Sequence, residues 1–313
     1  MTPTDETHLD RTAARVAAEL ARLGAVALPG GLYLVSTPIG NLADITLRAL
    51  SVLARADIVY CEDTRHSRKL LAHYAITTAT RPYHEHNAEA ERPRILRSLA
   101  DGRRIALISD AGTPLVSDPG HKLVRAAIEA GHRVESIPGA SAVLAALTSA
   151  GLATDSFLFA GFLPPRQQAR RTRIAELAAV PATLVLFEAP SRVAESLADL
   201  AAVLGSRPAA LARELTKLHE EIVRAPLDLL AAGAAQRAWK GEMVILVAPP
   251  VAVSATDADI ERQLTAALAR ASLKDAARAV AVSLGVPRSR VYQIGLSAKS
   301  AGRGSKDSEA PEE

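Results

Sequence analysis

The stretch RRIALISDAGTPLVSDPG, residues 103–120, joins a short apolar segment to a long polar loop. Ile105–Ile108 has the composition of a buried strand. The loop that follows, Ile108–Gly120, contains two acids, two glycines and two prolines. A connection between elements needs about two to five residues, so this loop is longer than a turn requires. Because glycine lets other groups approach the backbone closely, we expect the loop to present exposed backbone in a fixed shape at a strand end.

Strand and helix patterns alternate on both sides of this loop. Apolar segments that run into polar loops occur at LYLVSTPIGN, DIVYCEDT and RVESIP, and helix patterns such as HKLVRAAIEAG lie between them. This alternation predicts an α/β fold with a doubly wound, mostly parallel sheet. Ligands of such sheets bind beyond the carboxyl ends of the strands. The polar loops expected there predict a ligand cleft; they are residues 36–41, 61–66, 110–120, 138–141 and 188–192.

Changes in pattern divide the chain into five segments. These are an N-terminal extension, residues 1–30; a first α/β domain, residues 31–163; a second α/β domain, residues 164–250; a helical segment, residues 256–299; and a disordered tail, residues 300–313. The extension has the pattern of an amphipathic helix over about Leu9–Leu23. The boundary at residue 163 rests on Pro164 and Pro165, which interrupt the apolar pattern. The turn LGVPRS in the helical segment resembles that of a helix-turn-helix.

Composition narrows the class of protein. The 313 residues are 49% hydrophobic and 23% charged, as in a globular protein with a sizeable core. A net charge of +3 permits a polyanionic partner without requiring one. Cys61 is the single cysteine, which excludes a disulfide within the chain. The N-terminus lacks the pattern of a signal peptide, and no apolar run reaches the about 20 residues of a membrane helix, so we expect a cytoplasmic protein without membrane association.

Common nucleotide-binding and nucleophile motifs are absent from the sequence. It has no G-x-x-x-x-G-K-[ST] P-loop, no G-x-G-x-x-G after the first expected strand and no G-x-S-x-G elbow. His84 and His86 would share one face of a strand. Without a cysteine pair or an H-E-x-x-H motif they favour structural or substrate-facing roles, and we predict no metal site.

Nine motifs, taken together and in order, resemble one known family. They are STPIGNLADITLRA, CEDTRHSRKLL, YHEHN, SDAGTPLVSDPG, IPGASAVLAAL, FAGFLP, FEAPSRV, ARELTKLHEE and KGEMVILV. As a set they are similar to the bacterial 16S ribosomal RNA (cytidine-2′-O)-methyltransferases of the tetrapyrrole methylase superfamily. The resemblance covers roughly residues 31–248, and the helical segment is similar to the helix-turn-helix that follows in that family.

The resemblance implies two α/β domains of the class III methyltransferase type, with S-adenosyl-L-methionine bound in the cleft between them. On this view the long loop is a cradle for the cofactor. The cofactor-binding residues that the resemblance implies are Pro38, Gly112, Thr113, Pro114, Ser141, Ala142, Glu188, Ala189, Ala212, Gly241 and Glu242.

The resemblance also implies a substrate and a reaction. The target is a decoding-centre cytidine of 16S rRNA, presented within the assembled small ribosomal subunit, and the enzyme is a homodimer. A ribose hydroxyl must lose its proton, for which Asp63, Asp110 and Glu188 are candidate bases, while Arg65 could clamp a flanking phosphate. The arginines expected to contact RNA are Arg166, Arg170, Arg171, Arg173, Arg288 and Arg290.

Two other functions stay open from the sequence. A tetrapyrrole C-methyltransferase would share the fold and the cofactor, but it leaves the helical segment and the arginine runs unexplained. A nucleic-acid-binding regulator would use the C-terminal helices, but it leaves the loops of the expected cleft without a role.

Overall fold

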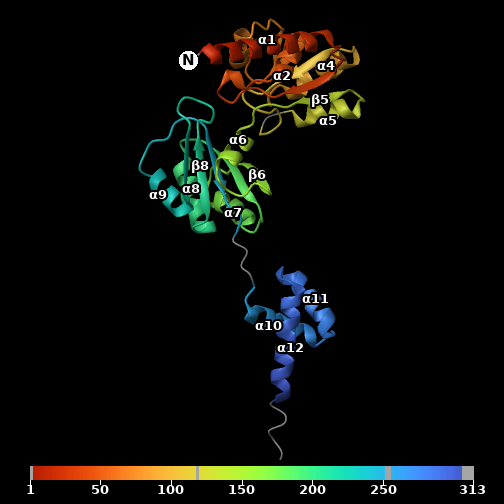
Figure 1. Cartoon of the computed structure of the whole chain (residues 1–313). Helices are drawn as coiled ribbons and strands as arrows, with labels where there is room; N and C mark the ends of the chain where they lie inside the picture. Colours follow the sequence, from red (N-terminus) through yellow and green to blue (C-terminus); the bar gives the residue numbers. More distant parts are fainter. Residues whose placement is uncertain (1–2, 118–119, 251–254, 305–313) are drawn as a thin grey trace, which may run out of the picture. The chain divides into compact units, whose positions relative to one another are not determined.

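The computed structural model describes residues 3–117, 120–250 and 255–304, and the chain divides after Pro250 into two compact units (Figure 1). The first unit contains two five-stranded sheets, and the second is helical. No helix within the described ranges is long and apolar enough to cross a membrane.

The first sheet is parallel throughout, with strand order β3-β2-β4-β1-β5. Its strands are β1 (Gly31–Val35), β2 (Ile58–Cys61), β3 (Thr80–Pro82), β4 (Arg104–Leu107) and β5 (Val134–Ile137). The helices after the first four strands are α2 (Leu47–Arg55), α3 (Thr64–His73), α4 (Ala88–Ala100) and α5 (His121–Glu129). The doubly wound parallel sheet predicted from the alternating patterns is therefore confirmed.

Both faces of this sheet are buried because successive residues of its inner strands point to opposite sides. Tyr33 and Val59 pack in one apolar cluster with α2 and α3, whereas Leu32, Tyr60 and Ile105 pack in another with α4 and α5. With both faces covered, the free edge for a ligand is the carboxyl end of the strands.

The second sheet is mixed, with strand order β6-β7-β10-β8-β9 and only β6 and β7 parallel. Its strands are β6 (Phe157–Phe162), β7 (Thr183–Glu188), β8 (Pro208–Arg213), β9 (Glu221–Pro226) and β10 (Met243–Val247). Because β6 pairs with β7, the sheet begins at Phe157, ahead of the boundary expected at residue 163. Pro164 and Pro165 end that first strand and do not separate the two domains.

Helices cover both faces of the second sheet. One face packs on α7 (Gln167–Leu177), α8 (Val193–Leu204) and α9 (Leu227–Ala234). On the other face α6 (Ala142–Ser149), which follows β5, buries Val143 and Leu147 against Val185, Ala210 and Leu246. Through this cluster α6 holds the loops of the first sheet beside β7 and β10.

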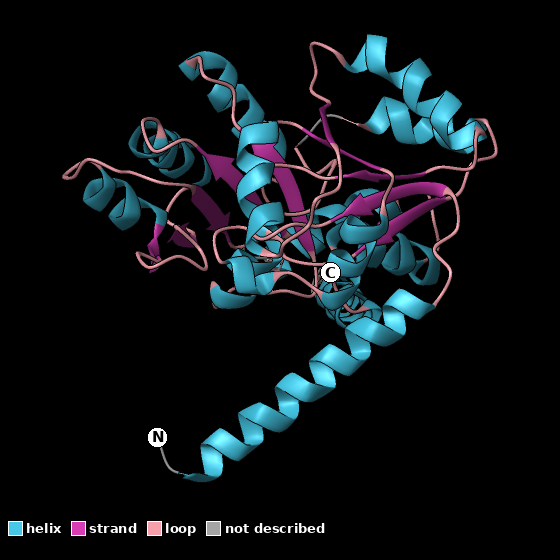
Figure 2. Cartoon of the chain, turned by 90° about the horizontal axis from the view of Figure 1, so that it is seen from above, coloured by secondary structure: helices cyan, strands magenta, loops and turns pink. Residues whose placement is uncertain are grey.

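The N-terminal extension forms a single helix, α1 (Pro3–Ala25), which is longer than the sequence pattern indicates and projects from the first unit (Figure 2). Its carboxyl end is tied down where the Arg55 guanidinium donates a hydrogen bond to the Leu23 carbonyl (2.7 Å). Most of its described side chains are exposed, as expected for a solvated extension.

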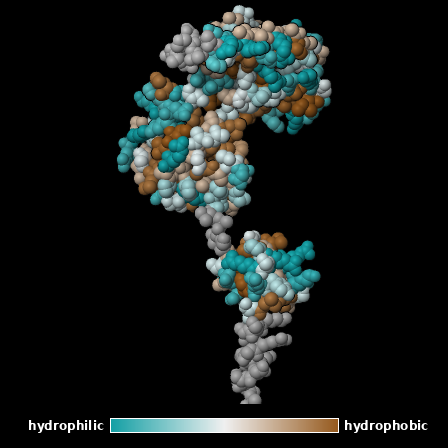
Figure 3. All heavy atoms as spheres, in the orientation of Figure 1, coloured by the Kyte–Doolittle hydropathy of each residue, from teal (hydrophilic) through white to brown (hydrophobic). Residues whose placement is uncertain are grey.

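The second unit consists of α10 (Asp257–Leu268), α11 (Leu273–Leu284) and α12 (Arg288–Gly304) around a small core that includes Ile260 and Val291. Gly285 ends α11 in the left-handed conformation. Hydrophilic and apolar residues both reach the visible face of these helices (Figure 3). The last helix continues to Gly304, into the expected tail, and residues 305–313 lie outside the described residues.

Candidate functional site

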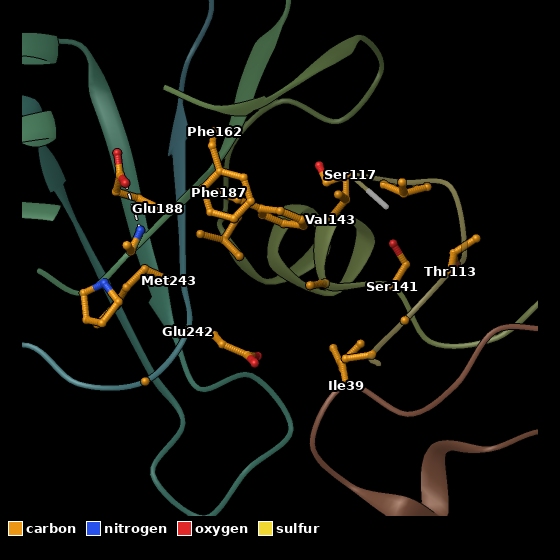
Figure 4. Close-up of a pocket in the computed structure, with 18 residues that line it drawn as sticks. Ile39, Thr113, Ser117, Ser141, Val143, Phe162, Phe187, Glu188, Glu242 and Met243 are labelled. Carbon is orange, nitrogen blue, oxygen red and sulfur yellow. Dashed lines mark hydrogen bonds between the residues drawn. The ribbon is translucent and has the colours of Figure 1, made fainter. Parts of the chain in front are cut away.

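A cavity of about 380 Å³ lies between the loops of the first sheet and the strands β7 and β10 of the second (Figure 4). Eight of the residues predicted to bind a cofactor line it, although they come from four separate segments of the chain. They are Gly112, Thr113, Ser141, Ala142, Glu188, Ala189, Gly241 and Glu242.

The long loop after β4 is held in a fixed shape, as its composition predicts. Thr37 and Gly112 form an isolated bridge in which each N–H donates to the other carbonyl, at 2.9 and 3.0 Å. Gly112 has a φ of 81°, a left-handed conformation that disfavours a side chain. A β-carbon there would lie 3.3 Å from Cγ2 of Ile39, which lines the cavity. Asp118 and Pro119, at the end of the quoted loop, lie outside the described residues.

Three predicted cofactor residues do not line this cavity. Pro38 lines a second cavity, together with Thr37. Ala212 is fully buried in the apolar cluster between α6 and the second sheet. Pro114 follows Thr113 in the loop, but it is not among the residues that border the cavity.

Apolar side chains form much of the cavity wall, and the sequence analysis did not single them out. Ile39, Phe162, Phe187 and Met243 all line it (Figure 4). The rings of Phe162 and Phe187 meet edge to face with centroids 5.7 Å apart. Each of these residues lies in one of the nine quoted motifs, and the motifs are the sequence feature that could have identified them. The alternation of apolar residues along a strand does not show which of them face a cavity.

The rim of the cavity carries a charged cluster. The Lys217 ammonium donates to Glu214 Oε1 (2.8 Å) and lies 3.3 Å from Glu242 Oε2. Its hydrogen bond holds the pKa of the Glu214 carboxyl below the ordinary value. The stem of Lys217 also packs on Gly40, where a β-carbon would come within 2.4 Å of Cγ. This lysine therefore joins the second sheet to the first-sheet loops beside the cavity.

Glu188, predicted as both a cofactor residue and a candidate base, has a carboxylate that is already fully engaged. It accepts hydrogen bonds from Ser196 Oγ (2.5 Å), from the Ala189 N–H (2.8 Å) and from Arg192 (3.2 Å), and it is buried. In Figure 4 it points away from the labelled residues of the first-sheet loops. The geometry gives this carboxylate a structural role and leaves its backbone to face the cavity.

Asp63 and Arg65 are paired with each other. Asp63 caps α3 by accepting the Arg65 N–H (2.8 Å), and the Arg65 guanidinium returns to the same carboxylate at 3.1 Å. This hydrogen bond holds the pKa of Asp63 below its ordinary value, which makes the carboxylate a weak proton acceptor.

Asp110 differs from the other two candidate bases. Its Oδ1 accepts the Asp63 N–H (3.1 Å), and its Oδ2 has no hydrogen-bond partner within the part of the chain that the structure describes. It is followed directly by Ala111 and Gly112, which line the cavity. Of the three carboxylates, Asp110 alone keeps a free oxygen next to the site.

The arginines predicted to bind RNA have different environments. Arg170 is 1% exposed, and it donates to Asp199 (2.7 Å) and to Glu195 (3.3 Å). Its guanidinium does not reach the surface, so the prediction that Arg170 contacts RNA is wrong. A charge run read along the chain cannot show that one member is buried against an acid on the next helix.

The remaining predicted arginines are accessible to different degrees. Arg171 shares Asp199 (2.6 Å), and Arg173 pairs with Glu176 (2.8 Å) along the same helix. Arg166 is exposed at the start of α7. In the second unit Arg290 pairs with Asp257 (2.6 Å), whereas Arg288 is exposed.

The polar groups of the cavity suit an organic ligand better than a metal. The described residues contain no group of three or more His, Cys, Asp or Glu arranged for a metal ion. His84 and His86 follow β3 in a coil and a turn and do not share a strand face. Exposed backbone and small hydroxyls on one wall, with aromatic and thioether side chains on the other, match a ligand that has both polar and flat apolar parts.

Sequence comparison finds close relatives over most of the chain. Residues 31–231 match the family described as Tetrapyrrole (Corrin/Porphyrin) Methylases, and residues 254–299 match the RsmI C-terminal HTH domain. A ribosomal RNA small subunit methyltransferase I from Mesorhizobium japonicum is 53% identical over 268 residues, which cover 85% of this chain and 91% of that protein. The protein of the same name from Escherichia coli O157:H7 is 45% identical over 271 residues, which cover 85% and 95%.

Solved structures show a related fold. The uroporphyrin-III C-methyl transferase from Thermus thermophilus complexed with S-adenyl homocysteine is 26% identical, with a TM-score of 0.50. The match covers 69% of this chain and 97% of that chain.

Proposed function

The chain belongs to the tetrapyrrole (corrin/porphyrin) methylases and, among them, to the ribosomal RNA small subunit methyltransferase I group, and from this premise we propose that it methylates small-subunit ribosomal RNA with S-adenosyl-L-methionine. The resemblance carried by the nine motifs is confirmed. The finer proposal is transfer of a methyl group to the 2′-oxygen of a cytidine ribose in the decoding centre of 16S rRNA, as that resemblance implies.

One observation carries the proposal: the loops after β1, β4 and β5 and the strands β7 and β10 converge on one cavity. Eight of the eleven predicted cofactor residues line it. A chance arrangement would scatter residues from separate segments over the surface, whereas a cofactor site requires them together.

The residues fit S-adenosyl-L-methionine. The left-handed backbone at Gly112 carries no side chain, so the cofactor can approach the cavity wall closely at this residue. Phe162, Phe187 and Met243 offer an apolar wall for an adenine ring. We infer that Gly241 and Glu242 close the adenosine side, with Lys217 holding the Glu242 carboxylate at the rim.

The chain's own contribution to the reaction is positioning and proton transfer. The bound cofactor supplies an activated methyl group, so much of the rate comes from holding the acceptor oxygen in line with it. Asp110 Oδ2 is free to accept the hydroxyl proton, and we propose Asp110 as the general base. Glu188 stabilises the loop at the end of β7 through Ser196 and Arg192.

RNA contacts would come from exposed arginines. We infer that Arg166, Arg171, Arg173, Arg288 and Arg290 contribute to phosphate binding, with Arg166 and Arg288 the more available of these residues. The proposed substrate is 16S rRNA within the small ribosomal subunit, and the proposed assembly is a homodimer.

The deciding experiment follows tritium from methyl-labelled S-adenosyl-L-methionine into three acceptors in parallel. These are small ribosomal subunits from a strain lacking this gene, naked 16S rRNA and a uroporphyrinogen-type tetrapyrrole. Label in subunit RNA, mapped to an alkali-resistant 2′-O-methylcytidine, is the expected result. Label in the tetrapyrrole alone would make the chain a tetrapyrrole C-methyltransferase. No label in any acceptor would favour the other alternative, a nucleic-acid-binding regulator.

A further inference from the structure

We propose that the second cavity of the first unit is the site of the acceptor nucleotide of the RNA substrate. The inference rests on the proposed function, because it names where the RNA substrate of that reaction binds. Transfer to a ribose hydroxyl requires the acceptor nucleotide to be held with its 2′-oxygen within reach of the cofactor, so its site must lie beside the cofactor cavity.

This cavity measures about 270 Å³ and is lined by three segments of the first sheet's carboxyl edge. They are the loop after β1, the first turns of α3 and the residues that follow β4. Pro38, Leu42 and Leu70 supply apolar surface on which the flat face of a base could lie.

Residues that line the two cavities are bonded to one another or adjacent in the chain. Thr37 lines the second cavity and Gly112 lines the first, and two backbone hydrogen bonds join these residues. In the same way Ile39 lines the first cavity, while Pro38 and Gly40 on either side of it line the second. A nucleotide held in the second cavity can therefore bring its ribose to the edge of the first.

Two polar groups at this cavity lack the hydrogen-bond partners that such groups normally have in a folded protein. Asp110 Oδ2 has no hydrogen-bond donor among the described residues. Ser67 is 3% exposed, and its hydroxyl has no hydrogen-bond partner there apart from the weakly polar thiol of Cys61. Buried hydroxyls are ordinarily satisfied, so this pair of groups indicates a polar ligand.

The charge at the cavity suits a phosphodiester. Lys69 and His66 line it, both are exposed, and neither forms an ion pair with another described residue. By contrast the nearby Arg65 is neutralised by Asp63. The unpaired Lys69 ammonium beside one free carboxylate matches a nucleotide, which carries an anionic phosphate and neutral hydroxyl and amino donors.

This placement completes the proton and bond balance of the proposed reaction. The 2′-oxygen forms a bond to the methyl carbon, the bond from that carbon to sulfur breaks, and sulfur keeps the electron pair. The hydroxyl proton passes to Asp110 Oδ2 and leaves to solvent afterwards. No oxidant, reductant or metal is needed.

The first test fills the cavity from its exposed rim. Leu42 is 37% exposed, so Leu42→Trp places an indole over the cavity without disturbing a packed core. We expect methyl transfer to the unmodified small subunit to fall about tenfold or more in kcat/KM, with the Kd for S-adenosylhomocysteine unchanged. The control is Leu229→Trp, which makes the same change at an exposed position of α9 and should match the wild type.

The second test reverses a single charge. Lys69→Glu should raise the KM for the subunit by about tenfold, because it places a negative charge where the phosphate would lie. Arg68→Glu makes the same change one residue earlier on α3, where the side chain is exposed and does not line the cavity. An equal effect in both variants would refute the cavity and point to general attraction between the enzyme and RNA.

The two proposals fail in distinguishable ways. If the wild-type enzyme labels the subunit and Leu42→Trp and Lys69→Glu do so equally well, the acceptor site is elsewhere and the proposed function stands. If the wild-type enzyme labels only the tetrapyrrole or nothing at all, the proposed function itself is wrong, and the acceptor assignment falls with it.

Discussion

Replacing Gly112 with valine tests the cofactor cradle directly. The φ of 81° at this residue lies in the left-handed region, where a non-glycine residue costs about 1–2 kcal/mol and a β-branched one is especially disfavoured. The new β-carbon would also lie 3.3 Å from Ile39 Cγ2 and 3.7 Å from the Ala140 carbonyl. Ile39, which lines the proposed cofactor cavity, must then shift by a few tenths of an ångström.

We therefore expect two separable effects of Gly112→Val. Folding stability should fall by about 1–2 kcal/mol from the backbone term, a drop in Tm of a few degrees for a domain of this size. The affinity for S-adenosylhomocysteine should fall by about tenfold or more, which corresponds to about 1.4 kcal/mol. Calorimetric titration measures the affinity, and thermal unfolding measures the stability.

Gly131→Val is the matched control for the backbone strain. Gly131 has a φ of 76° just after α5, and a β-carbon there meets no atom within 4 Å. It should lose similar stability and bind S-adenosylhomocysteine normally. A folded Gly112→Val protein with wild-type affinity would refute the cradle assignment, and an equal loss of affinity in both variants would attribute the effect to general destabilisation.

Three further predictions concern groups whose partners the structure identifies. Arg170→Leu should destabilise the protein by about 3 kcal/mol in urea unfolding, because it removes the buried partner of Asp199 and leaves that carboxylate to the half-exposed Arg171. Arg173→Ala, at a surface pair, should cost about 1 kcal/mol or less, and equal losses would contradict the buried network. The hydrogen bond from Arg104 lowers the pKa of Asp57 below its ordinary 3.8, so this pair stabilises the fold above that pH, and its contribution is lost as pH falls through the lowered value. Asp57→Asn should therefore make the fall of the unfolding free energy below about pH 5 less steep. An unchanged dependence of that free energy on pH would contradict this prediction. Asp110→Asn should lower kcat about 100-fold or more with cofactor affinity intact, whereas Glu188→Gln should stay within about tenfold, and the reverse order would exchange their roles.

Local patterns in the sequence were sufficient for the first sheet. The apolar segments at β1, β2, β4 and β5 end in polar loops, and helices lie between them, so the order of elements can be predicted from the sequence. The same loops account for much of the lining of the first cavity, because the carboxyl ends of parallel strands meet at one edge. These inferences need only neighbouring residues.

Local sequence patterns did not predict which sheet the strand before Pro164 belongs to. Pro164 and Pro165 mark the end of an apolar strand, but the pairing of β6 with β7 decides which sheet that strand joins. Strand pairing is a contact between distant residues and leaves no signal in the segment itself. The mixed direction of the second sheet is hidden for the same reason.

The roles of the charged residues were decided by tertiary structure alone. In the sequence Arg170 is an expected RNA contact and Glu188 a candidate base, yet Asp199 and Ser196 on α8 engage them in the interior. Asp110 looks no different in sequence, and it keeps a free oxygen only because no donor packs against it among the described residues. Sequence determines which groups can ionise and where along the chain they lie. Packing determines which of them remain available, because an ion pair or a hydrogen bond depends on side chains that folding brings together from far apart.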